Sequence, residues 1–207
     1  MHQMSESDDA EICRCVLAST AVLYRPVTIP ELVALVEQLE EFADNLESAR
    51  EIVSLCGSFL TLREDTVYFV HQSAKDFLFA KASEEVFLDG PEDIHRVVFF
   101  QSLTILSRTL RRDIYSIEAP GFPIDNVEPP DLDPLAVSRY PCIYWIDHLY
   151  DSKPKFLGNN DRDLQVTGVV DEFIQQKYLY WLEGLSLCKS LGSGVVSMAK
   201  LWSLVQV

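Results

Sequence analysis

The spacing of apolar residues changes twice between residues 46 and 82, and this change constrains the fold more than any other feature. Residues 46–56 have the spacing of a helix, whereas residues 59–62 and 66–70 are rich in β-branched and aromatic residues. The charged triplet at residues 63–65 fits the tip of a hairpin between these two runs. Helical spacing returns from residue 72 onward. We therefore expect a helix, a two-stranded hairpin and a helix, in that order.

Two further helices are predicted before this segment. Asp9 can cap a helix over residues 10–23, and Thr28-Ile29-Pro30-Glu31 has the pattern of a capping box that opens a second helix. Residues 40–45 are expected to form a loop. Three helices followed by a hairpin and a helix are the order of a winged helix. We assign this fold to residues 10–88, after a disordered tail at residues 1–9.

The second half of the chain is predicted to be helical apart from one proline-rich segment. A helical extension is expected over residues 89–118, with its helix at residues 91–115. Five prolines within residues 119–134 exclude a continuous helix or a central strand, so this segment is a linker or an extended strap. Residues 135–207 are expected to be all-α, with a helix break at residues 191–194. The predicted fold class is mainly α with a small β-hairpin.

The distribution of charge argues against nucleic acids and membranes as partners. The net charge is −15, and residues 1–90 hold 6 basic against 17 acidic side chains. The helix in the place of a recognition helix carries Glu47, Arg50 and Glu51, and such a surface repels phosphate groups. A DNA-binding winged-helix regulator is kept as the alternative.

Three further features indicate a cytoplasmic protein. No apolar run approaches the roughly 18 residues of a membrane span, and the first residues are polar and acidic, unlike a signal peptide. The five cysteines are scattered and suggest buried thiols in a reducing compartment.

The motifs of catalysis are missing from the sequence. Neither the phosphate-binding G-x-x-x-x-G-K-[ST] nor the nucleophile motif G-x-S-x-G occurs, and the Cys and His spacings fit no zinc site. We predict no catalytic residue, no metal, no cofactor and no enzymatic activity. A hydrolase of a new kind is a weaker alternative that needs a pocket joining Cys, His and Asp.

Two candidate sites remain. His71 falls between the second hairpin strand and the next helix, where an imidazole can point at an anion that the helix amides also favour. The alternative is an ordinary strand-end histidine bonded to a neighbour. Arg108, Arg111 and Arg112 are predicted to form a positive ridge on one helix, suited to an acidic surface or partner.

Residues 17–28, 55–63 and 69–78 resemble the segment that follows the NACHT nucleotide-binding domain in fungal NLR-like proteins of vegetative incompatibility, which belong to the STAND NTPases. This first part is similar to the winged-helix domain named after GPI inositol-deacylase. Residues 107–115, 119–123 and 177–183 resemble the following region of the same proteins. The resemblance covers residues 12–204.

The resemblance implies a non-catalytic, autoinhibitory module of a nucleotide switch in self/non-self recognition or programmed cell death. Its partner would be the NACHT domain, in cis in a full-length protein and otherwise in trans, with WD40 or ankyrin repeats as further partners. In related proteins a histidine at the position of His71 touches the β-phosphate of bound ADP. A truncated gene product and a genuine short protein both fit the sequence.

Overall fold

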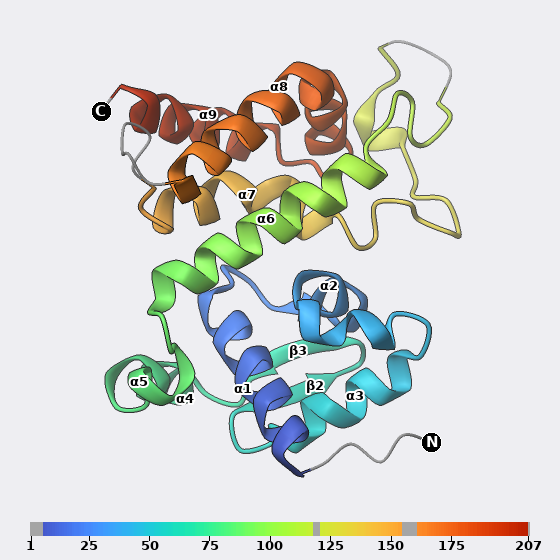
Figure 1. Ribbon diagram of the computed structural model, residues 1–207. Helices are drawn as coiled ribbons and strands as arrows, with labels where there is room; N and C mark the ends of the chain where they lie inside the picture. Colours follow the sequence, from blue (N-terminus) through green and yellow to red (C-terminus); the bar gives the residue numbers. More distant parts are fainter. Residues whose placement is uncertain (1–5, 118–120, 155–160, 207) are drawn as a thin grey trace. The chain divides into compact units, whose positions relative to one another are not determined.

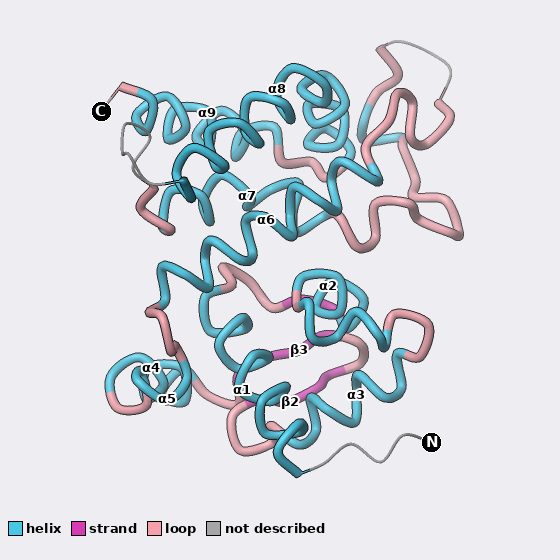
Figure 2. Tube along the Cα trace, viewed as in Figure 1, coloured by secondary structure: helices cyan, strands magenta, loops and turns pink. Residues whose placement is uncertain are grey.

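The computed structural model describes residues 6–117, 121–154 and 161–206 (Figure 1). These residues form mainly helices with one small antiparallel sheet, which confirms the predicted fold class (Figure 2). The chain divides into two compact units, Met1–Gln101 and Ser102–Val207. Helix α6, Pro91–Thr109, contains the boundary between them.

The first unit contains the predicted helices and hairpin. Its elements are α1 (Glu6–Val22), β1 (Val27–Thr28), α2 (Ile29–Leu35), the 3-10 helix η1 (Glu37–Phe42), α3 (Leu46–Leu55), β2 (Leu60–Arg63), β3 (Thr66–Phe69), α4 (Gln72–Ala80) and α5 (Ser83–Val86). Of the tail predicted at residues 1–9, residues 1–5 lie outside the described residues. Residues 6–9 belong to α1, so the prediction was wrong for them.

The loop predicted at residues 40–45 was also wrong in part. The chain continues as η1 up to Phe42, because Leu39 is fully buried and fixes the segment against the unit.

The sheet has the strand order β1-β3-β2 with antiparallel pairs. The β2–β3 hairpin is confirmed, and Arg63 pairs with Thr66 across its tip. Strand β1 was missed because two residues show no alternation; it is fixed by Val27, which pairs with the fully buried Val67. Figure 1 shows α1, α2 and α3 around this sheet, and α2 packs on both α3 and β1.

The capping box at the start of α2 is confirmed. Thr28 accepts a hydrogen bond from the Glu31 amide, and the Glu31 carboxylate accepts one from the Thr28 amide at 3.1 Å. Each side chain thereby satisfies a backbone donor that the first helical turn leaves unpaired.

The described part of the second unit comprises the end of α6, the 3-10 helix η2 (Ile124–Asn126), α7 (Arg139–Asp151), α8 (Asp161–Leu187) and α9 (Leu191–Val205). Its core is aromatic. Trp145 and Trp181 are both fully buried, and their rings meet edge to face with centroids 5.7 Å apart. The indole N–H of Trp181 donates to the Cys142 carbonyl at 2.8 Å, which links α8 to α7.

The helix predicted at residues 91–115 ends earlier, at Thr109. Lys177 donates to the carbonyl of Leu110 at 2.9 Å, and the Glu183 carboxylate accepts from the amides of Asp113 and Ile114 at 3.2 and 3.0 Å. Both partners come from α8. The helix stops because distant side chains satisfy the backbone groups that its next turn would have used.

The proline-rich segment is described from residue 121 onward; residues 118–120 lie outside the described residues. It contains η2 and is otherwise irregular up to residue 134. Asp133, near its end, accepts hydrogen bonds from the Tyr115 hydroxyl at 2.7 Å and from Arg139 at 2.7 Å. This part of the segment is therefore anchored within the second unit.

The glycines at residues 192 and 194 do not break a helix, contrary to the prediction. The break falls at residues 188–190, where Lys189 has a positive φ of 53°, and both glycines lie in the first turn of α9. Gly194 is required by packing: a Cβ at this position would lie 2.4 Å from the Leu185 side chain, which is fully buried. A Cβ at Gly192 would meet nothing within 4 Å.

We expect Gly194→Ala to lower the free energy of unfolding of the second unit by about 1–3 kcal/mol, because Leu185 cannot move away without disturbing the core. Gly192→Ala is the matched control, and we expect it to be neutral or stabilising by up to about 1 kcal/mol through helix propensity. Urea denaturation followed by tryptophan fluorescence measures both. Equal effects at the two positions would contradict the packing role of Gly194.

Candidate functional site

His71 lies between β3 and α4 and is the N-cap residue of α4. Its Nδ1 accepts a hydrogen bond from the Ser73 amide at 3.2 Å and lies 2.9 Å from the Ser73 hydroxyl. Because Nδ1 is the acceptor, the proton of the neutral ring resides on Nε2. No partner is placed at Nε2 among the residues that the structure describes, and the side chain is exposed. The ring therefore offers one N–H donor to solvent or to a partner.

This geometry corrects one part of the sequence-based hypothesis for His71. The imidazole and the helix amides were expected to serve the same anion. Instead, His71 itself occupies the Ser73 amide, and the Ala74 amide donates to the His71 carbonyl at 2.9 Å. An anion beside α4 would therefore be held by Nε2–H rather than by these amides.

A cavity of about 280 Å³ opens beside the start of α4 and the end of α1, and Gln72 lines it while His71 does not. Lys75 lines it and donates to the Leu23 carbonyl at 3.3 Å. Burial lowers the pKa of the Lys75 ammonium, and the nearby Asp76 carboxylate opposes this effect. The half-buried position of Lys75 was not predicted, because a single lysine on an amphipathic helix is ordinarily a solvated residue.

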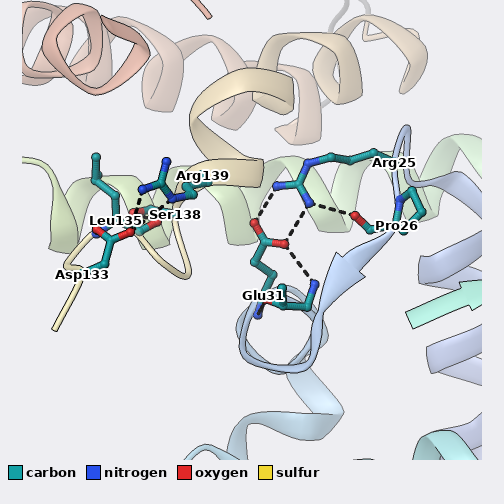
Figure 3. A network of polar contacts seen from close by, with 8 residues as sticks. Arg25, Pro26, Glu31, Asp133, Leu135, Ser138 and Arg139 are labelled. Carbon is teal, nitrogen blue, oxygen red and sulfur yellow. Dashed lines mark hydrogen bonds and ion pairs between the residues drawn. The ribbon is translucent and has the colours of Figure 1, made fainter. Parts of the chain in front are cut away.

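Arg25 also lines this cavity, but its charge is already neutralised (Figure 3). Its guanidinium donates to both oxygens of Glu31, at 2.9 and 2.6 Å, and to the Pro26 carbonyl at 2.8 Å. The Glu31 side chain is only 3% exposed, so this bidentate pair holds the start of α2 in place. Arg25 is a structural residue in this arrangement.

Helix α3, which the sequence analysis compared with a recognition helix, offers little positive charge. Arg50 is the only basic residue of α3, and it donates to Asp65 at 2.5 Å and to Glu47 at 3.1 Å. Glu47 and Glu51 are exposed on the same helix. A duplex would meet two carboxylates and one arginine that is already paired, which opposes phosphate binding.

The predicted arginine ridge does not form on a helix. Arg108 lies in the last turn of α6, whereas Arg111 and Arg112 follow its end at Thr109. Arg108 and Arg112 are four residues apart in the sequence, but they do not lie on one face of a helix, because α6 ends between them. All three side chains are exposed, and Arg112 lines a cavity of about 310 Å³ with Glu183.

The cluster around Asp133 is structural (Figure 3). Burial by itself would raise the pKa of the Asp133 carboxyl. Hydrogen bonds from Tyr115, Arg139 and the Leu135 amide outweigh burial and lower this pKa below its ordinary value. Asp133 is therefore held ionised as the anchor of the segment before α7.

Other features bear on chemistry. Among the described residues, no group of three or more His, Cys, Asp or Glu side chains could hold a metal ion. Within the same residues, no helix is long and apolar enough to cross a membrane. His148 is fully buried, and its Nε2 lies 2.7 Å from the Tyr140 hydroxyl, so it is part of the core.

Comparison with known proteins gives one informative match. The chain is 48% identical over 217 aligned positions, which cover 99% of it, to a part of the vegetative incompatibility protein HET-E-1 of Podospora anserina. It spans only 16% of the length of that protein. No family model matches the chain, and no solved structure matches it significantly. The match supports the resemblance to proteins of vegetative incompatibility.

Proposed function

We propose that this chain is a non-catalytic regulatory module of a NACHT-type nucleotide switch, acting in the cytoplasm in vegetative incompatibility. Its 48% identity to a part of HET-E-1 is the observation that carries this proposal. The order α1, β1, α2, α3, β2, β3, with the sheet order β1-β3-β2, supports the interpretation of the first unit as a winged helix.

The proposed mechanism is differential contact between two states of the switch. The winged helix packs on the nucleotide-bound NACHT domain in the ADP state and moves away in the ATP state. His71 supplies a contact of the closed state, because its Nε2–H can donate to a phosphate oxygen of bound ADP. The ring is held in place by the cap on Ser73 and by the strand end before it, where the Val70 amide donates to the Phe59 carbonyl at 2.8 Å.

The alternative of a DNA-binding regulator is less favoured, because Arg50 is paired with two carboxylates. A regulatory role also needs no catalytic group in this chain. The nucleotide and its hydrolysis would belong to the NACHT domain.

A chimera tests the proposal directly. The matching segment of HET-E-1 is replaced by this chain, and the incompatibility reaction is scored in Podospora anserina together with the abundance of the protein. We expect the chimera to produce the incompatibility reaction only when the nucleotide switch is triggered, and not in its resting state. Val67→Asp in the inserted chain is the control: it places a charge in the core and should remove this regulation. A chimera of normal abundance that never reacts would contradict the proposal.

A further inference from the structure

Helix α9 carries an apolar stripe that the packing of its own unit leaves largely exposed. The stripe consists of Leu191, Val195, Met198, Trp202 and Val205, separated by four, three, four and three residues. This alternation is the spacing of the d and a positions of a coiled coil, with Val195 and Trp202 at a and the other three residues at d.

Most of the stripe is exposed to solvent. Val195 is 73% exposed, Trp202 64%, Val205 61% and Leu191 48%, while Met198 is half-buried. A different face of the helix is buried, through Gly194, Ser197 and Leu201, and α9 packs with α7 and α8 (Figure 1). The helix is thus held in its unit by its other face. The stripe is a solvent-exposed apolar surface, which is typical of an interaction site.

The stripe offers nothing that would select a charged partner. The only charged residue of α9 is Lys200, which forms an ion pair with Asp147 of α7. Residues 102–207 hold 10 basic and 13 acidic side chains, whereas residues 1–101 hold 7 and 19. A second copy of this nearly neutral unit would therefore meet little repulsion at the stripe.

We propose that the stripe pairs with the same stripe of a second copy of this chain. Such an isologous contact is self-complementary, because the same residues meet from both copies. The four exposed side chains offer roughly 450 Å² per copy, or about 900 Å² in a dimer, which lies at the low end of specific interfaces. The dimer is therefore weak, with a dissociation constant on the order of 1–100 µM.

This inference is independent of the proposed function, although a dimer would bring two regulatory modules together. Sedimentation of the 207-residue chain over a concentration range of about 1–300 µM tests it. We expect a reversible monomer–dimer equilibrium. Trp202→Glu should raise the dissociation constant at least about tenfold, because it replaces the largest apolar side chain of the stripe with a charge. Val195→Glu should have the same effect and serves if the first variant has an altered circular dichroism spectrum.

Val196→Glu is the matched control. Val196 is 59% exposed on the same helix, but it occupies the outward-facing b position. The dimer dissociation constant of this variant should therefore stay within about twofold of that of the unmodified chain. A monomer throughout the range would overturn the proposal. So would a dimer that stripe substitutions leave intact, or one that Val196→Glu weakens equally.

Discussion

Replacement of Trp181 by alanine is expected to lower the free energy of unfolding of the second unit by about 3–5 kcal/mol. The side chain is fully buried, and its ring meets that of Trp145 edge to face with the centroids 5.7 Å apart. Its indole N–H donates to the Cys142 carbonyl. The substitution thus creates a large cavity and removes the hydrogen bond to the Cys142 carbonyl.

Denaturation in urea measures this effect. All three tryptophans lie in the second unit, so the fluorescence of Trp145 and Trp202 still reports on its unfolding in the variant. Trp202→Ala is the control, since that side chain is 64% exposed, and we expect a change within about 0.5 kcal/mol at low protein concentration. If both variants lost the same stability, the assignment of Trp181 to the core would be wrong.

The second large effect concerns nucleotide retention. We expect His71→Ala, in the chimera with the HET-E-1 nucleotide-binding region, to speed ADP release roughly ten- to a hundredfold. This factor corresponds to the loss of one charge-assisted hydrogen bond of about 1.5–3 kcal/mol. Basal activity should rise as well, because the lost contact is made only in the closed state. Release of a fluorescent ADP analogue measures the first effect, and the untriggered incompatibility reaction measures the second.

The cap formed by His71 requires a second variant. His71→Ala also removes the acceptor for the Ser73 amide, and the loss of an N-cap by itself costs roughly 0.5–2 kcal/mol of stability. Serine is a good N-cap but has no donor at the position of Nε2. His71→Ser should therefore regain most of the stability and still release ADP quickly. Lost stability with unchanged ADP release in His71→Ala would leave His71 with a structural role only.

The sequence by itself determined the features that depend on residues close along the chain. The capping box at Thr28 and Glu31, the hairpin around residues 63–65 and the start of α4 after His71 are set by interactions over two to four residues. Such interactions leave a readable pattern of caps, turns and spacing. The mainly α fold class followed from the same patterns.

The candidate site was predictable only in part. The position of His71 at a strand-to-helix junction followed from local spacing. The use of its Nδ1 in the helix cap did not, because a side chain chooses between a backbone amide and an external anion only in the folded geometry. The pairing of Arg50 with Asp65, fifteen residues away, was likewise invisible in the sequence.

Only the tertiary structure decided where α6 ends and why Gly194 is a glycine. Lys177 and Glu183 of α8 bond the backbone just after α6, although they lie 67–70 residues further along the chain, and α6 therefore ends there. As a result, the three arginines do not share one helix. Gly194 lies within α9 because Leu185 leaves no room for a Cβ. The physical reason is the same in both cases. A buried backbone group needs a hydrogen-bond partner and a buried side chain needs space, and distant residues supply or deny both.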